Sequence, residues 1–161
     1  MGSDSTSPRM SIATSIVELK AWTPEVAAIE TETNQLPWPI DTLKSCFSHG
    51  YQNFGVYSNE HKQLLGFIIV HQPMPDEWTI MNVVISSAFQ RQGFGKKLVG
   101  YVCDLALAAN ASVFLEVRES NQAAIELYTQ LGFKNLGRRK GYYPTALGDH
   151  EDAIVMQRSS A

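Results

Sequence analysis

The sequence has little of what metal, redox or membrane functions require. Its only two cysteines, Cys46 and Cys103, lack CxxC spacing, so we predict two core thiols in a reducing, cytoplasmic compartment. Its four histidines follow no ligand or triad spacing, and no metal site is expected. No apolar run approaches the roughly 20 residues that a membrane span needs. The first residues lack the basic and hydrophobic regions of a signal peptide, so we expect neither secretion nor membrane association.

Neither sign of charge is in large excess. The formal net charge is −3, which argues against a nucleic acid as partner. The 161 residues, 44% of them hydrophobic, suffice for one domain with its own core. We predict a single, monomeric domain over residues 11–158 and a short tail at 159–161. Residues 1–10, rich in serine and without periodicity, are interpreted as a disordered leader or tag.

Hydrophobic periodicity predicts an α/β domain. The predicted strands cover residues 15–20, 53–57, 64–70, 78–85, 113–117, 134–139 and 152–157. The predicted helices cover residues 24–34, 41–49, 94–109 and 121–131. Short links in the first half favour an antiparallel meander, whereas the helix over 94–109 joins two strands by a parallel βαβ crossover. We therefore expect a mixed central sheet with an antiparallel N-terminal half and helices on both faces.

The segment Gln-Arg-Gln-Gly-Phe-Gly at residues 90–95 lies between a predicted strand and a predicted helix. Glycines in this position let backbone N–H groups approach a ligand, and the helix directs its positive dipole end to the same point. Arg91, Lys96 and Lys97 add positive charge. The segment lacks the Gly-Lys-Ser/Thr ending of a Walker loop and is not GxGxxG. It predicts a pyrophosphate site, with a plain glycine-rich turn as the alternative.

Three residues downstream carry candidate chemistry. Strand alternation places Glu116 on the face opposite Leu115 and Val117, where a carboxylate is unexpected in a strand packed by helices. It is either a general base or a carboxylate that pairs with Arg118 or lies at a sheet edge. Tyr128 lies on the apolar stripe of its helix and on that ground alone would be a core aromatic. Asn121 fits an N-cap.

Segments along most of the chain resemble the GNAT superfamily of N-acetyltransferases. The resemblance rests first on Gln-x-x-Gly-x-Gly at 90–95 and on Leu-Glu-Val-Arg at 115–118. Further matching segments lie at residues 36–38, 120–121, 123–125, 127–128, 131–133, 142–144 and 151–153. Within the superfamily they are similar to the RimI family of ribosomal-protein alanine acetyltransferases. Ser-Ser-Ala at 86–88 departs from the Asp-Pro that relatives usually carry there, which should alter loop rigidity more than chemistry.

The resemblance implies acetyl-CoA as cosubstrate and direct transfer in a ternary complex, with Glu116 as general base and Tyr128 as the acid near the CoA sulfur. The implied cofactor-binding residues are Val83, Val84, Ile85, Arg91, Gln92, Gly93, Phe94, Gly95, Lys96 and Asn121. The implied walls of an acceptor groove are Trp38, Tyr142 and Tyr143, each of which could equally be a packing aromatic.

The acceptor that the resemblance implies is a protein with a free N-terminal amine, namely the N-terminal alanine of the eighteenth small-subunit ribosomal protein. Two alternatives remain open. One is an acetyltransferase of other peptides, lysines or small amines. The other is a protein that binds acyl-CoA without catalysis, against which the presence of both Glu116 and Tyr128 argues.

Overall fold

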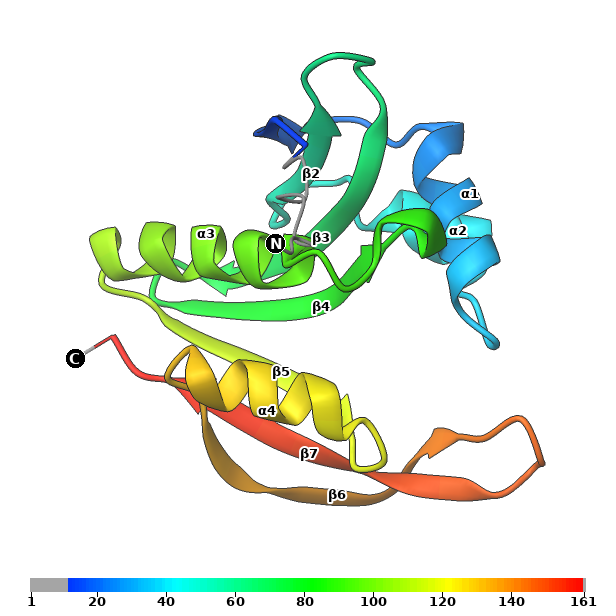
Figure 1. Ribbon diagram of the computed structural model, residues 1–161. Helices are drawn as coiled ribbons and strands as arrows, with labels where there is room; N and C mark the ends of the chain where they lie inside the picture. The colour runs from blue at the N-terminus through cyan, green and yellow to red at the C-terminus, as the bar shows by residue number, and fades with distance from the viewer. Residues whose placement is uncertain (1–11, 161) are drawn as a thin grey trace, which may run out of the picture.

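A seven-stranded sheet in the order β1-β2-β3-β4-β5-β7-β6 runs through the molecule (Figure 1). This computed structural model describes residues 12–160, so the predicted leader over residues 1–10 lies outside the described part. The strands are β1 (Thr14–Leu19), β2 (Asn53–Ser58), β3 (Leu64–Met74), β4 (Glu77–Ile85), β5 (Ser112–Arg118), β6 (Lys134–Pro144) and β7 (His150–Arg158). The helices are α1 (Pro24–Thr33), α2 (Ile40–Ser45), α3 (Phe94–Ala108) and α4 (Gln122–Gln130), with a 3₁₀ turn, η1 (Ser87–Phe89).

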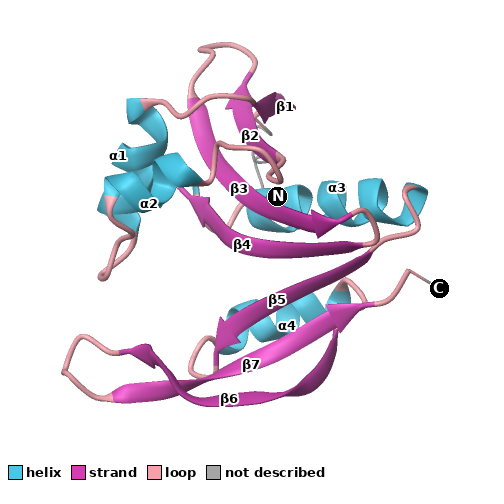
Figure 2. Ribbon diagram, turned by 180° about the vertical axis from the view of Figure 1, so that it is seen from behind, coloured by secondary structure: helices cyan, strands magenta, loops and turns pink. Residues whose placement is uncertain are grey.

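The predicted mixed topology is confirmed. β1 to β4 form an antiparallel meander, and β5, β7 and β6 also pair antiparallel. The parallel pair is β4 with β5, joined through α3, and its register runs only from Glu77↔Ser112 to Ile80↔Leu115. Beyond these pairs the two strands diverge, as both views show (Figures 1 and 2). The sheet is therefore open on one side of its centre.

Helices cover both faces of the sheet. α3 and α4 pack on one face, where Leu98 and Val102 meet Val113 and Leu115 in a buried cluster. α1 and α2 pack on the other face, in a second cluster that includes Phe67 (Figure 2). None of the helices within residues 12–160 is long and apolar enough to cross a membrane.

Several elements differ in length from the sequence-based prediction, and β3 runs on to Met74, beyond its predicted end at residue 70. The helix predicted over 41–49 ends at Ser45, because the chain then continues in tight turns. The Cys46 N–H donates to the Leu43 carbonyl and the Phe47 N–H to the Lys44 carbonyl, each three residues back. The last two strands are longer than predicted, because the β6–β7 ladder continues past a register shift between Arg139 and Tyr143. The long hairpin that results, together with the segment between α1 and α2, flanks the open side of the sheet (Figure 1).

Candidate functional site

The segment between β4 and α3 forms a compact loop that contains η1. Gln90 folds back, and its Nε2 donates to the Ile85 carbonyl at 3.1 Å. Arg91 and Gly93 both adopt left-handed backbone conformations, with φ of 64° and 84°. Gly93 is also the N-cap of α3. Because the first amides of a helix have no partner within it, this junction has the geometry of an anion site.

A groove of about 540 Å³, called here the loop-side groove, opens beside this loop. Eight predicted cofactor residues line it: Val83, Val84, Ile85, Arg91, Gly93, Phe94, Gly95 and Lys96. α4 contributes Ala124 and Leu127 to its lining. Gln92 is exposed outside the lining, and Asn121 lies in a neighbouring cavity. The groove thus brings most of the predicted cofactor set together, with these two exceptions.

Residues 86–88, which lack the Asp-Pro that relatives usually carry there, are held by hydrogen bonds to α1. Glu32, in the last turn of α1, accepts a hydrogen bond from Ser86 Oγ at 2.7 Å and one from the Ser87 N–H at 3.3 Å. The loop is therefore tied to α1. Lys97, in contrast to Arg91 and Lys96, lies outside the lining of the loop-side groove, and its Nζ donates to Thr14 Oγ1 of β1 at 2.9 Å.

The divergence of β4 from β5 opens a second cavity of about 370 Å³, called here the central cleft. Seven predicted site residues line it: Val83, Glu116, Tyr128, Asn121, Trp38, Tyr142 and Tyr143. Asn121 also caps α4, since its Oδ1 accepts from the Ala124 N–H at 3.2 Å. Val83 and Asn34 line both the cleft and the loop-side groove, so the two cavities adjoin.

Glu116 reaches the cleft from β5 with 26% of its side chain exposed. Its Oε2 accepts a hydrogen bond from Arg139 Nη1 at 2.7 Å, across the sheet from β6. Arg118, the partner considered from the sequence, instead contacts Glu151 at 3.3 Å and the Pro144 carbonyl at 2.8 Å. Glu116 is therefore not paired with Arg118. It lies just beyond Leu115, the last residue of β5 that pairs with β4, so β5 is open toward β4 at this position and pairs only with β7.

Tyr128 belongs both to the core and to the cleft. Its side chain is 7% exposed and its ring packs against Phe133, with centroids 5.8 Å apart. Burial raises the pKa of Tyr128 to about 12. Among the described residues its hydroxyl has no hydrogen-bond partner. At neutral pH it therefore offers a proton donor toward the cleft.

Tyr142 and Tyr143 of β6 each make a cation–π contact with an arginine. Arg139 Cζ lies 4.0 Å from the ring centroid of Tyr142, and Arg118 Cζ lies 4.6 Å from that of Tyr143. The two rings meet edge to face, 5.0 Å apart. Burial and the negative charge of Glu116 raise the pKa of Tyr143 to about 12. Cation–π contacts of this kind fix guanidinium positions, so the aromatic wall also orients the charges around Glu116.

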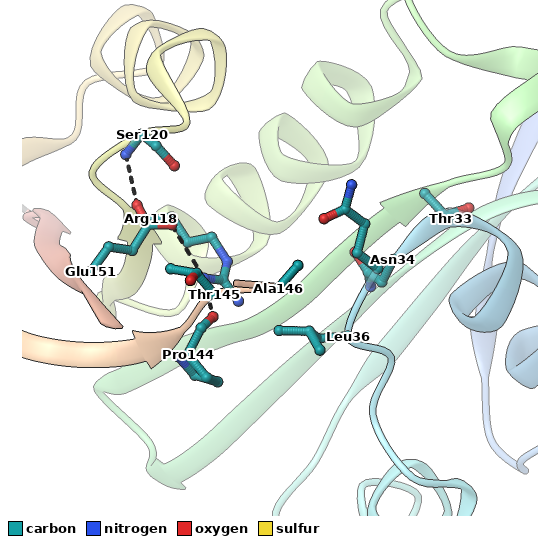
Figure 3. Close-up of a pocket in the computed structure, with 10 residues that line it drawn as sticks. Thr33, Asn34, Leu36, Arg118, Ser120, Pro144, Thr145, Ala146 and Glu151 are labelled. Atoms are coloured by element: carbon teal, nitrogen blue, oxygen red, sulfur yellow. Dashed lines mark hydrogen bonds and ion pairs between the residues drawn. The ribbon is translucent and has the colours of Figure 1, made fainter. Parts of the chain in front are cut away.

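A third cavity, the outer pocket of about 360 Å³, lies between the end of α1 and the β6–β7 hairpin. Figure 3 shows Thr33, Asn34 and Leu36 on one side of it, and Arg118, Pro144 and Glu151 among the residues on the other. The Ser120 N–H donates to Glu151 at 3.1 Å and completes this polar wall. Asn34 lines all three cavities, so groove, cleft and pocket meet at the end of α1.

Three residues of the site were not predicted from the sequence. Glu30 is fully buried behind the cleft, although its spacing of four residues from Val26 on the inward face of α1 was an available signal. Asn34 directly follows α1 and Arg139 lies two strands from Glu116. No local pattern in the sequence marks either of them, because both positions depend on how distant elements pack.

Comparison with known proteins agrees with this geometry. The profile of the Acetyltransferase (GNAT) family matches residues 17–133. A [Ribosomal protein bS18]-alanine N-acetyltransferase from Haemophilus influenzae is 39% identical over 80% of this chain and 86% of its own length. The enzyme of the same name from Escherichia coli K12 is also 39% identical, over 83% of this chain and 88% of its own.

A crystal structure of the ribosomal-protein-S18-alanine N-acetyltransferase from Escherichia coli superimposes with a TM-score of 0.85 at 35% identity. The superposition covers 92% of this chain and 95% of that one. The matched family, the identities of the relatives and the fold agree with each other. The chain belongs to the GNAT family and is an acetyl-CoA-dependent N-acetyltransferase.

Proposed function

We propose that this chain transfers the acetyl group of acetyl-CoA to the N-terminal α-amine of a protein, and that the acceptor is the N-terminal alanine of ribosomal protein bS18. The observation that carries the transfer chemistry is the meeting of Glu116 and Tyr128 in one cleft that adjoins the loop-side groove. The identity of the acceptor is supported by the relatives that carry this activity in their names. A ribosomal acceptor is consistent with a cytoplasmic location.

Acetyl-CoA fits the loop-side groove by its chemistry. The amides at the start of α3, with Gly93 at the N-cap, suit the pyrophosphate, and Arg91 and Lys96 add positive charge. Gln92 would contribute its backbone N–H, since its side chain lies outside the groove lining. The part of β4 beyond Ile80, free of β5, can offer backbone groups to the amides of the pantetheine arm.

The transfer requires a neutral amine, which attacks the thioester carbonyl as the C–N bond forms and the C–S bond breaks. Glu116 is placed to accept the amine proton, directly or through a water. The pKa of Tyr128, about 12, lies above the roughly 8.5 of a thiol. Tyr128 would therefore act chiefly as hydrogen-bond donor to the departing thiolate. The proton that the amine loses balances the proton that the CoA thiol finally gains.

The test is an assay of thiol release with a panel of acceptors. The panel holds an alanine-initiated peptide, the same peptide with a blocked N-terminus and an internal lysine, and spermidine. We expect at least tenfold higher kcat/KM for the free alanine peptide and, by mass spectrometry, acetylation only at its α-amine. Equal rates across the panel would refute the proposed acceptor but not the family. Binding of acetyl-CoA without turnover on any amine would favour a protein that binds acyl-CoA without catalysis.

A further inference from the structure

Glu30 is a carboxylate with no exposed surface, in the last two turns of α1. Its Oε2 accepts a hydrogen bond from the Trp38 backbone N–H at 2.9 Å, and its Oε1 accepts one from Asn82 Nδ2 at 2.9 Å. Among the described residues no cation pairs with it. Burying a carboxylate without a cation is costly, so a residue of this kind calls for a reason beyond filling space.

The first donor belongs to the segment between α1 and α2, where Trp38 also packs against the second core cluster. Trp38 stands between Pro37 and Pro39, and proline has no backbone N–H. The Trp38 N–H is therefore the one backbone donor of this Pro-Trp-Pro segment, and Glu30 takes it. The Trp38 side chain forms part of the central cleft.

The second donor lies on the opposite wall. β4 pairs with β3 at Ile69↔Asn82 and then at Val70↔Ile80, so Met81 is an extra residue, and the strand bulges there. A bulge re-aims the side chains beside it. It lies just beyond Ile80, the last residue of β4 paired with β5. Asn82 also lines the central cleft, and its amide group is held by Glu30.

We propose that Glu30 is a positioning residue for the acceptor. It holds Trp38 and the bulged part of β4 at a fixed separation and so sets the shape of the cleft that receives the amine-bearing chain end. This inference rests on the proposed function, because it takes the cleft to be the acceptor site. Glu30 contacts neither Glu116 nor Tyr128 in the hydrogen bonds of the described residues, so its effect is on acceptor binding rather than on proton transfer.

An exchange of partners tests the idea. Asn82→Asp replaces the donating amide by a second carboxylate, so two acceptors of like charge then face each other. Glu30→Gln with Asn82→Asp restores a donor–acceptor match, because the new amide can donate to the new carboxylate while its oxygen still accepts from Trp38. Glu30→Gln alone should have a small effect, because the Asn82 amide can turn and accept from the new NH₂ group. We expect Asn82→Asp to raise KM for the alanine peptide about tenfold. The double variant should return to within about threefold of wild type.

Three readouts separate positioning from general damage. KM for acetyl-CoA and the rate of the slow acceptor-free release of thiol should change much less than the peptide KM in Asn82→Asp, and Glu25→Gln, an exposed glutamate of the same helix, should match wild type throughout. Asn82→Ala, which removes the amide donor without adding a charge, should raise the peptide KM severalfold and serves if Asn82→Asp does not fold. Parallel changes in both KM values, or no recovery in the double variant, would overturn the proposal. Failure of the wild-type enzyme on peptide N-termini would instead count against the proposed function.

Discussion

Glu116, which lines the central cleft, pairs with Arg139 although β7 separates their strands in the sheet. The arginine is half-exposed and stacked on Tyr142, so it neutralises the carboxylate without sealing the cleft. An ion pair of this kind orients a carboxylate and can open when a cationic chain end arrives, because exposed pairs contribute little energy. The acceptor ammonium would then replace the guanidinium as the partner of Glu116.

At this scale we predict that Glu116→Gln lowers kcat about 100-fold near pH 6.5 and much less near pH 9. A peptide α-amine has a pKa of about 7.7 to 8.0, so it needs a base mainly below that range and is largely neutral above it. Stopped-time thiol release across pH, at saturating acetyl-CoA, measures this. Glu126→Gln, an exposed change of the same charge on α4, is the control. A loss that is constant across pH would contradict the role of base.

Strand alternation alone predicted that Glu116 lies on the face opposite Leu115 and Val117, and the alternating burial along β5 confirms this. It did not predict the partner. Arg118 shares the face of Glu116 on the same strand and was the natural candidate, whereas Arg139 becomes a neighbour only through the pairing of β6 and β7. Side-chain partners across non-adjacent strands depend on register, which local sequence does not specify.

At the scale of single elements, the junction between the loop and α3 requires an unusual backbone conformation at Gly93. Gly93 has a φ of 84°, and a Cβ built there would meet nothing within 4 Å, so only the backbone conformation calls for glycine. Gly100, inside α3, also has open space around it but an ordinary helical conformation. The two glycines therefore differ in the one property that decides the effect of an added methyl group.

We predict that alanine at these two positions changes the free energy of unfolding in opposite directions. Gly93→Ala should lower the free energy of unfolding by about 1–2 kcal/mol through left-handed strain and raise KM for acetyl-CoA. Gly100→Ala should raise the free energy of unfolding by about 0.5–1 kcal/mol and leave KM unchanged. Urea denaturation of both variants, with KM for acetyl-CoA from the thiol assay, measures this. Equal effects of the two changes would contradict a special conformation at Gly93.

Element types were predictable from periodicity, and the strand–loop–helix setting of residues 90–95 is as expected. Element ends were less so. α2 is shorter than its pattern because Ser45 and Ser48 bond backbone carbonyls of the preceding turn and favour turns over helix. β6 is longer because Gly141, with a φ of 58°, lets the strand continue through an irregularity, where its N–H donates to Asp152.

At the scale of the whole molecule, the buried phenol of Tyr128 and the partly buried phenol of Tyr143 make stability depend on alkaline pH. Burial raises the pKa of both Tyr128 and Tyr143 to about 12, against about 10 for an exposed tyrosine. The folded state therefore holds these protons more tightly than the unfolded state. Their contribution to stability is complete below about pH 10 and is lost as the pH rises from about 10 to about 12.

We predict that the free energy of unfolding of the wild-type protein falls more steeply over this interval than that of Tyr128→Phe or Tyr143→Phe. The double phenylalanine variant should have the shallowest dependence. Urea titrations at pH 8, 10 and 11 measure the slope, and the comparison between variants removes the contribution of lysines, which all of them share. Identical slopes would show that neither phenol is held in its protonated form by the fold.

The short pairing of β4 with β5 leaves a sheet edge in the interior of the molecule rather than at its rim. The β4 side of this edge is assigned above to the pantetheine arm, so the β5 side, beyond Leu115, remains for an extended chain end. α4 and the segment after α1 border the cleft there, through Tyr128 and Trp38. A cleft of about 370 Å³ is large enough for an extended chain end and too small for a folded N-terminus. The enzyme would thus select the conformational state of its acceptor as well as its sequence, and would act on chain ends before they become ordered.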